Sequence, residues 1–226
     1  LLRSGIAERM YDGSVKWLGW LPGGLMHAIS GSCALFAATS GSSVATAATI
    51  GTVAIPQIER RGYNERLFLG TVAAGGTLGI LIPPSINLIL YGLLTDTSVP
   101  ELYLAGFLPG FLLAALFMAT VVVLCVLRPG WGGERVQVSW AERLAALPAL
   151  LPPIGIFLVV VGSIYAGLAT PTEAAALGVV AALILAASNR TLSIDMLRQA
   201  IEGSGAPERY LRKVDLDGLR EQFLAF

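Results

Sequence analysis

Residues 25–58 read LMHAISGSCALFAATSGSSVATAATIGTVAIPQI, without a single Asp, Glu, Lys or Arg. They belong to a charge-free stretch from Trp17 to Ile58 and contain Ser40-Gly41-Ser42-Ser43 near their middle. The arms on either side, residues 25–39 and 44–58, would each form roughly 22 Å of helix, shorter than a hydrocarbon core of roughly 30 Å. We therefore predict a re-entrant hairpin over residues 25–58 with its tip at residues 40–43, where protein or water must satisfy the non-helical backbone.

Basic residues predict the orientation of this hairpin. They occur in residues 1–16, 59–66 and 128–143, whereas residues 96–101 and 169–173 contain none. Because Lys and Arg collect in cytoplasmic loops, both ends of the hairpin are expected on the cytoplasmic side. Residues 1–16 are then a cytoplasmic amphipathic segment, and the later spans alternate across the membrane.

Four further charge-free stretches extend the predicted membrane domain over residues 17–200. The first of these stretches, residues 67–95, is interrupted by Gly75-Gly76, Gly79 and Pro83-Pro84. Tandem prolines remove two backbone donors and clash with the preceding turn, so a broken helix is predicted here. The other stretches predict spans at residues 102–127, 144–168 and 172–189, of which the first is the plainest lipid-contacting scaffold. The expected fold is an all-α, polytopic helical membrane protein with a re-entrant hairpin and a broken transmembrane helix.

The composition agrees with a membrane domain. Hydrophobic residues make up 55% of the chain and charged residues only 13%, which is about half the charged share of a soluble domain. The net charge is zero and no basic patch is interleaved with aromatic residues, so nucleic acid is not an expected partner. Residues 201–226 are hydrophilic by contrast, and we expect this divergent tail to lie in water.

Catalytic side chains are scarce. The only histidine, His27, has no neighbouring nucleophile signature, and no nucleotide or zinc motif occurs. Glu173 follows Thr170 by three residues with Pro171 between them, which is the pattern of a helix capping box. We therefore predict no catalytic residues, and a membrane-embedded enzyme that depends on His27 is kept only as an alternative.

The two predicted helix interruptions suit ion binding. Broken helices expose carbonyl groups without intrahelical partners, and neighbouring hydroxyls add oxygens, a ligand set for a hard monovalent cation such as Na⁺. The helix that begins after the tip favours an anion, such as a carboxylate of a solute, at its N-terminal end. The predicted Na⁺ ligands are Ser40, Gly41, Ser42, Ser43, Gly79 and Pro83. The predicted solute contacts are Val44, Ala45, Thr46, Ser85 and Asn87.

Other interpretations of single residues stay open. Small residues such as Ala45, Thr46, Thr49 and Thr52 also form the close-packing faces of membrane helices. Asn87 is polar within an apolar half-helix, so its amide is either hydrogen-bonded to a neighbour or lines the solute path. Packing alone, however, does not require two interruptions in successive segments, and this favours a binding site for the cluster as a whole.

Five motifs taken in order carry a resemblance to a known family. They are Ser40-Gly41-Ser42-Ser43-Val44-Ala45-Thr46-Ala47, Arg61-Gly62-Tyr63, the run from Gly76 to Ser85 (GTLGILIPPS), Ala105-Gly106-Phe107-Leu108-Pro109-Gly110, and Thr170-Pro171-Thr172-Glu173-Ala174. Together they resemble the large membrane subunit of tripartite ATP-independent periplasmic (TRAP) transporters, the DctM-like family.

The resemblance implies a multi-pass permease of the bacterial inner membrane that is driven by a Na⁺ gradient, with no other cofactor. It implies a small membrane subunit (DctQ-like) and a periplasmic solute-binding protein (DctP-like) as partners, and organic anions such as C4-dicarboxylates or sialic acid as solutes. It also implies an elevator-type fold, of which this chain is one inverted-repeat half. Residues 40–43 would be the tip of the first hairpin, and residues 79–85 the broken helix beside it.

The chain departs from this family in length. Members carry a second inverted repeat that has no counterpart here, and the sequence after about Ala200 stops looking like the family. The chain also begins without Met, so we expect it to be a piece of a longer protein. A truncated or frameshifted, non-functional remnant of such a permease is therefore the main alternative to a working transporter subunit.

Overall fold

A computed structural model describes residues 5–133, 136–189, 192–193 and 197–198. This part of the chain is helical, without a β-strand, and confirms the predicted all-α class. The helices are α1 (Ile6–Leu18), α2 (Leu25–Ser40), α3 (Ser43–Ala54), α4 (Gln57–Arg61), α5 (Glu65–Leu81), α6 (Ile86–Thr95), α7 (Val99–Leu127), α8 (Trp140–Tyr165) and α9 (Pro171–Ser188), with a 3₁₀ turn at Pro129–Trp131.

Three of these helices, α7, α8 and α9, are long and apolar enough to cross a membrane. Helices α5 and α6 meet at a bend of 40° across a short break, and together they are long and apolar enough for one broken span or a re-entrant loop. The chain is therefore a multi-pass helical membrane protein, and the predicted broken helix over residues 67–95 is present.

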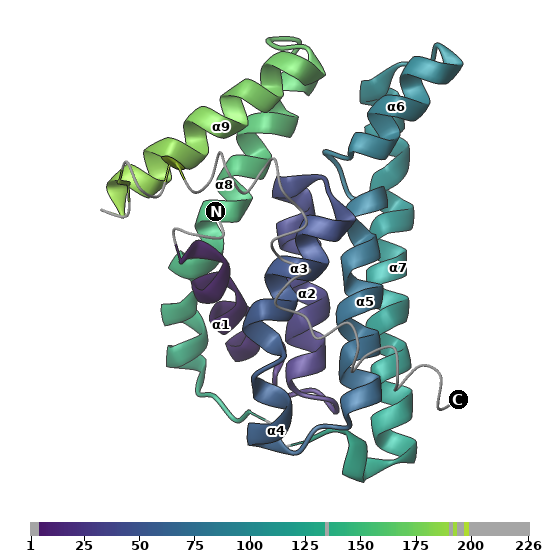
Figure 1. The fold of residues 1–226 in the computed structure, drawn as a ribbon, viewed down its shortest axis with the longest axis vertical. Helices are drawn as coiled ribbons and strands as arrows, with labels where there is room; N and C mark the ends of the chain where they lie inside the picture. The colour runs from purple at the N-terminus through teal and green to yellow at the C-terminus, as the bar shows by residue number, and fades with distance from the viewer. Residues whose placement is uncertain (1–4, 134–135, 190–191, 194–196, 199–226) are drawn as a thin grey trace.

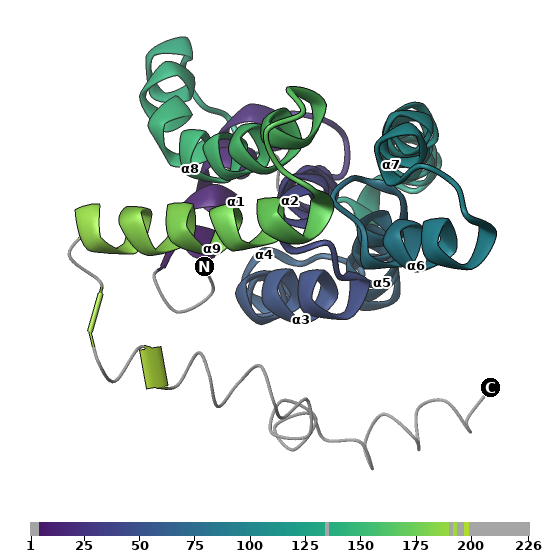
Figure 2. The same cartoon turned by 90° about the horizontal axis from the view of Figure 1, so that it is seen from above.

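Helix α2 occupies the centre of the molecule. Seen from above, α1 and α8 lie on one side of it, while α3, α5 and α7 lie around the other sides (Figure 2). Helices α3 and α5 both pack along α2, and α7 covers the outer side of α5 (Figure 1). Helix α9 runs obliquely toward α1, where Arg9 Nη1 donates a hydrogen bond of 2.8 Å to Asn189 Oδ1.

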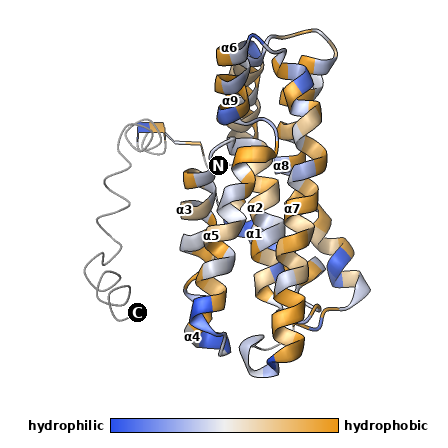
Figure 3. Ribbon diagram, turned by 90° about the vertical axis from the view of Figure 1, so that its right-hand side faces the viewer, coloured by the Kyte–Doolittle hydropathy of each residue, from blue (hydrophilic) through white to orange (hydrophobic). Residues whose placement is uncertain are grey.

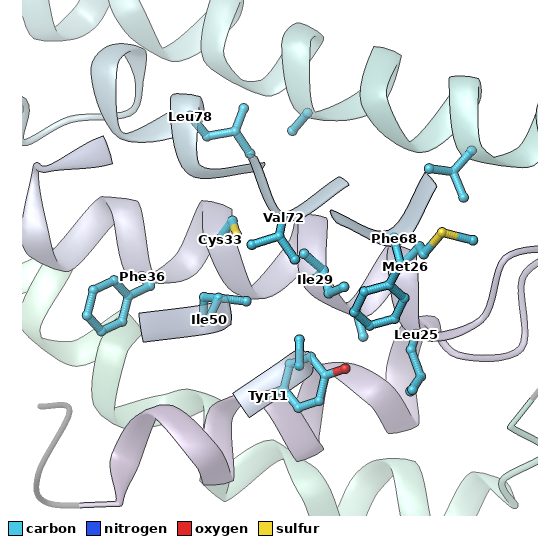
Figure 4. Close-up of a cluster of buried hydrophobic side chains, with 14 of the residues drawn as sticks. Tyr11, Leu25, Met26, Ile29, Cys33, Phe36, Ile50, Phe68, Val72 and Leu78 are labelled. Atoms are coloured by element: carbon cyan, nitrogen blue, oxygen red, sulfur yellow. The ribbon is translucent and has the colours of Figure 1, made fainter. Parts of the chain in front are cut away.

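The buried core joins α2 to its neighbours. One face of α2 presents Leu25, Ile29 and Cys33 at helical spacing, and all three are fully buried. They lie among Phe68 and Val72 of α5, with Ile50 of α3 and Tyr11 of α1 nearby (Figure 4). This packing fixes the hairpin arms against α5, which positions the two helix interruptions relative to each other.

The outer helices expose their apolar side chains instead. Leu108 on α7 is 79% exposed, and Leu151 and Leu158 on α8 are also largely exposed. Figure 3 shows the resulting hydrophobic surface along α7, whereas hydrophilic residues gather at the ends of the bundle, such as at α4. An exposed apolar surface of this kind fits contact with lipid, in line with the scaffold role expected for residues 102–127.

Several predicted boundaries need correction. The glycines at positions 75, 76 and 79 lie within the continuous helix α5, so the prediction that they interrupt it was wrong. A helix tolerates glycine at a cost of about 1 kcal/mol each, and neighbouring helices pack against these positions. Helix α8 begins earlier than residue 144, at Trp140, because Ser139 and Glu142 form a capping box that the sequence analysis overlooked.

The second hairpin arm also differs from the expected one. Helix α3 ends at Ala54 instead of continuing to Ile58, and the short helix α4 follows after Pro56. The N-terminal segment packs as helix α1 against α2 and α8, with Met10 and Tyr11 buried. Residues 201–226 lie outside the described residues. The re-entrant placement of the hairpin and the cytoplasmic side of its ends stay predictions.

Candidate functional site

The hairpin tip is a sharp reversal between α2 and α3. Gly41 ends α2 in the left-handed conformation (φ 62°), and its N–H donates to Ala37 O at 2.9 Å. Glycine is the residue that adopts this conformation without steric cost. Ser42 then begins α3 as its N-cap, with its Oγ accepting the Ala45 N–H at 3.3 Å. The tip at residues 40–43 is therefore encoded locally by a glycine stop followed by a serine start.

Hydroxyl groups connect the two sides of this tip. Thr46 is fully buried, and its Oγ1 donates to Ser42 O at 2.7 Å. Ser40 Oγ lies 3.2 Å from Thr46 Oγ1 and accepts the Ser42 N–H at 3.5 Å. Three oxygen-bearing residues are thus tied together where the two arms meet.

The helix break between α5 and α6 spans residues 82–85. Pro83 and Pro84 have no N–H, so Gly79 O and Ile80 O lose the donors that a continuous helix would supply. Ser85 compensates one of them, because its fully buried Oγ donates to Ile80 O at 2.6 Å. Gly79 O has no donor at position i+4, because that position is Pro83, which has no N–H. The break therefore offers a carbonyl oxygen within residues 67–95, which contain no Asp, Glu, Lys, Arg or His.

The two interruptions meet each other directly. Ile86 N–H, at the start of α6, donates to Gly41 O at 3.3 Å. A Cβ atom placed on Gly41 would lie only 2.4 Å from Pro84 O. The hairpin tip is thus seated in the break, and glycine is required at position 41 for both its conformation and its contact.

Two more glycines, on one face of α5, continue this contact. A Cβ on Gly79 would approach the Ser42 carbonyl carbon and the Ser43 nitrogen to 2.9 Å, and one on Gly76 would approach Ala47 Cβ to 2.6 Å. We call Gly41, Gly76 and Gly79 the glycine seam. It lets the backbones of α3 and α5 approach closely, as small residues do at membrane helix interfaces.

The structure brings together most of the predicted cation ligands. Gly79 packs against the backbone of Ser42 and Ser43, which directly follow Gly41 in the tip. Ser40 is tied to them through Thr46, and Pro83 is buried within the break. Of the predicted solute contacts, Thr46 and Ser85 also lie here, fully buried.

The remaining predicted solute contacts lie on the surface of this half. Val44 is 73% exposed, and Ala45 and Asn87 are exposed as well. Asn87 has no hydrogen bond from its side chain to any described residue, which argues against the neighbour-bonded interpretation of its amide. These three residues are therefore separate from the buried oxygen cluster, although they follow directly on it in sequence.

The predicted cation site is composed of neutral oxygens. The tip and the break supply backbone carbonyls and the hydroxyls of Ser40, Ser42 and Thr46, without a carboxylate. The described residues contain no group of three or more His, Cys, Asp or Glu side chains that could hold a metal. Neutral oxygens at broken helices suit Na⁺ better than a transition metal, which prefers nitrogen and sulfur ligands.

Sequence reasoning missed three contributors to this site. Pro84 supplies the carbonyl under Gly41, Ile86 supplies the N–H that reaches Gly41 O, and Gly76 carries the seam onto Ala47. The spacing of Gly76 and Gly79, three residues apart on one helix face, was the available signal. This spacing indicates a packing face within a continuous helix. The sequence prediction instead treated these glycines as helix interruptions.

Comparisons with known proteins agree on one family. The sequence profile described as "Tripartite ATP-independent periplasmic transporter, DctM component" matches residues 1–207. The chain is 43% identical over 176 residues to the C4-dicarboxylate TRAP transporter large permease protein DctM of Pseudomonas aeruginosa, which covers 78% of this chain and 41% of that protein.

Two further relatives are named for different solutes. The ectoine TRAP transporter large permease protein TeaC of Halomonas elongata is 35% identical over 185 residues, covering 82% of this chain and 43% of TeaC. The isethionate TRAP transporter permease protein DctMQ of Oleidesulfovibrio alaskensis is 38% identical over 185 residues, covering 80% of this chain and 28% of DctMQ. The chain spans less than half the length of each of these relatives. It is a multi-pass inner-membrane protein that belongs to the DctM family of TRAP transporter large permease components.

Proposed function

We propose that this chain is part of the membrane permease of a Na⁺-coupled secondary transporter for small organic anions. The observation that carries the proposal is the seating of the hairpin tip in the α5–α6 break, with Gly41 against Pro84 O. This contact collects neutral oxygens from two interrupted helices in one place, and such sites bind coupling ions in transporters.

The expected solutes and partners follow from the family. The relatives are named for a C4-dicarboxylate, ectoine and isethionate, so closely similar permeases serve different small solutes. We propose an organic anion of the C4-dicarboxylate or sialic-acid type, delivered by a periplasmic solute-binding protein. We also propose a small membrane subunit as partner, and the name DctMQ of one relative joins two components in a single permease protein.

Uptake by the complete transporter that contains this segment tests the proposal. Uptake of a labelled C4-dicarboxylate into proteoliposomes should require an inward Na⁺ gradient and the binding protein. Ser42→Ala and Ser43→Ala should raise the Na⁺ concentration needed for half-maximal uptake by about threefold to tenfold, as expected when a cation loses one neutral ligand or its support.

Thr77→Ala provides the matched control. Its hydroxyl lies on α5 near the site, but it is exposed and donates only to Ala74 O within the same helix. The Na⁺ requirement of this variant should match that of the parent protein. Uptake that is indifferent to Na⁺, or an equal change in the Thr77 variant, would contradict the proposed cation site.

An enzymatic role is the alternative to transport, and it is the weaker one because the family is a transporter family. It would require solute turnover in purified membranes that is lost in His27→Ala.

A further inference from the structure

All four tryptophans of the chain lie at one end of the bundle. Trp17 and Trp20 are at the end of α1, Trp131 follows α7, and Trp140 begins α8. The loops that carry them are joined: Val136 N–H donates to Gly19 O at 3.0 Å, and Asn64 N–H donates to Trp131 O at 3.3 Å. Tryptophans concentrate in this way where a membrane protein meets the headgroup region of the bilayer.

Arg143 lies over two of these indole rings. Its guanidinium carbon is 4.8 Å from the ring centre of Trp140 and 5.8 Å from that of Trp20. These distances are within the range of cation–π interactions, which orient a guanidinium with its flat face on the ring. At the same end, Arg128 lies 4.5 Å over Trp131.

The charge of Arg143 has no counter-ion among the described residues. Its Nε is buried without a hydrogen-bond partner, and its terminal nitrogens are neither buried nor hydrogen-bonded in this part of the chain. The adjacent carboxylate, Glu142, is occupied as a helix cap that accepts the Ser139 N–H at 2.8 Å and the Ser139 Oγ–H at 2.7 Å. A planar, uncompensated guanidinium is thus held open at the surface.

This guanidinium lies at the head of an apolar, exposed stripe. Trp140 is 70% exposed, and Leu144, Leu147 and Leu151 follow it at helical spacing on α8, all exposed. Such a stripe on a membrane-crossing helix faces the acyl chains of lipids. A ligand of Arg143 that also covers this stripe needs an anionic head and an apolar tail.

We propose that Trp20, Trp140 and Arg143 form a binding site for the phosphate headgroup of an anionic phospholipid, whose acyl chain lies along the exposed stripe of α8. The phosphate accepts from the terminal guanidinium nitrogens, for which arginine geometry is well suited. The indole rings hold the guanidinium in place and border the headgroup. A free phosphate ion shares the head chemistry but leaves the stripe uncovered, so the site is assigned to a lipid.

Lipid binding by the purified full chain in detergent tests this site. Native mass spectrometry should show retained phosphatidylglycerol in preference to phosphatidylcholine, and Arg143→Gln should weaken that retention about tenfold, which is the loss of about 1.4 kcal/mol. Trp140→Leu keeps the apolar surface but removes the ring, and should weaken retention less, by about threefold. Arg143→Lys keeps the charge and provides a folded comparison if Arg143→Gln does not fold.

Arg60→Gln is the matched control, since Arg60 is an exposed arginine on α4, also among the loops between membrane helices. Retention of phosphatidylglycerol in this variant should stay at the parent level. The proposal is overturned if Arg143→Gln retains as much lipid as the parent, or if Arg60→Gln loses as much. It is also overturned if inorganic phosphate displaces the lipid at equal concentration, because the site would then bind the free anion. Neither outcome bears on Na⁺ coupling, so this site and the proposed function fail separately.

Discussion

The protein contains two pairs of adjacent prolines with opposite consequences. Pro83-Pro84 separates α5 from α6 with a bend of 40°, whereas Pro152-Pro153 lies inside the uninterrupted helix α8. In the first case Ser85 Oγ satisfies a released carbonyl, and the hairpin tip occupies the opening through Gly41. At the second pair, Pro153 is buried, but no other segment of the described chain makes a hydrogen bond to α8 there. A Pro-Pro dipeptide therefore permits a helix break, and contacts with a neighbouring segment determine whether the helix is broken there.

The same contrast applies to glycine. The Cβ positions of Gly41, Gly76 and Gly79 all come within 3 Å of another segment, whereas those of Gly155 and Gly162 meet open space. In the hairpin region glycine is needed so that backbones can touch. In α8 it only lowers helix propensity. Substitutions in the two regions should accordingly change stability in opposite directions.

Gly41→Ala is expected to have the largest effect on this contrast. Alanine is strained at φ 62°, and its Cβ would clash with Pro84 O, so the free energy of unfolding should fall by about 3 kcal/mol. Unfolding by SDS in mixed micelles measures the change. Gly62→Ala is the control, because Gly62 has a similar φ of 65° but open space at its Cβ, and should lose only about 1 kcal/mol. Equal losses at the two positions would show that the seated tip adds nothing.

Gly79→Ala compared with Gly155→Ala should give effects of opposite sign. The first places a Cβ against the Ser42–Ser43 backbone and should lower the free energy of unfolding by about 2 kcal/mol. The second improves helix propensity in open space and should raise it by about 0.5 kcal/mol. The same SDS titration, carried out on both variants, reports the difference. A neutral Gly79→Ala variant would mean that α3 and α5 do not touch at the seam.

Ser85→Ala tests the compensation of the proline break. Loss of the buried Oγ leaves Ile80 O without its donor, so the free energy of unfolding should fall by about 1 kcal/mol. Thr120→Ala on α7 removes an exposed hydroxyl that donates to Leu116 O within a continuous helix. This variant should leave the midpoint of thermal unfolding unchanged. If both variants behave alike in thermal unfolding followed by tryptophan fluorescence, the hydroxyl of Ser85 has no special role at the break.

Pro152→Ala should have the smallest effect. Alanine restores an N–H donor toward Pro148 O at a position that is only half-buried, so the free energy of unfolding should stay the same or rise by about 0.5 kcal/mol. Circular dichroism should show unchanged helix content. A loss of stability would mean that the prolines of α8 are held by packing, as Pro83-Pro84 is, and would remove the contrast between the two pairs.

Much of this architecture could be predicted without coordinates. The hairpin tip at residues 40–43 and the break at Pro83-Pro84 follow from local chemistry, since glycine permits a left-handed stop and proline removes donors. The capping box at Thr170 and Glu173 was also predicted and is confirmed. Predictions were wrong where a weak breaker met strong packing, as for the glycines at positions 75, 76 and 79 within α5.

Two predicted helix ends were also wrong, at the end of α3 and at the start of α8. The predicted second arm ran through Ile55 and Pro56 to Ile58, but α3 ends at Ala54. Ile55 still has a helical backbone, and the ladder stops because Pro56 has no N–H to donate to Thr52 O. The start of α8 was predicted at residue 144, where the charge-free stretch begins. The capping box of Ser139 and Glu142 begins the helix earlier, within the charged loop.

The sequence by itself determined the helical membrane class, the two interruptions and the oxygen-bearing residues beside them, because these depend on hydropathy and on backbone chemistry within a few residues. Only the tertiary structure decided that Gly41 rests on Pro84, that Gly79 faces Ser42 and Ser43, and that Val44 and Asn87 lie outside the buried cluster. Contacts between segments some forty residues apart arise from the packing of α2, α3 and α5 around a shared core, and such packing has no signature in the local sequence.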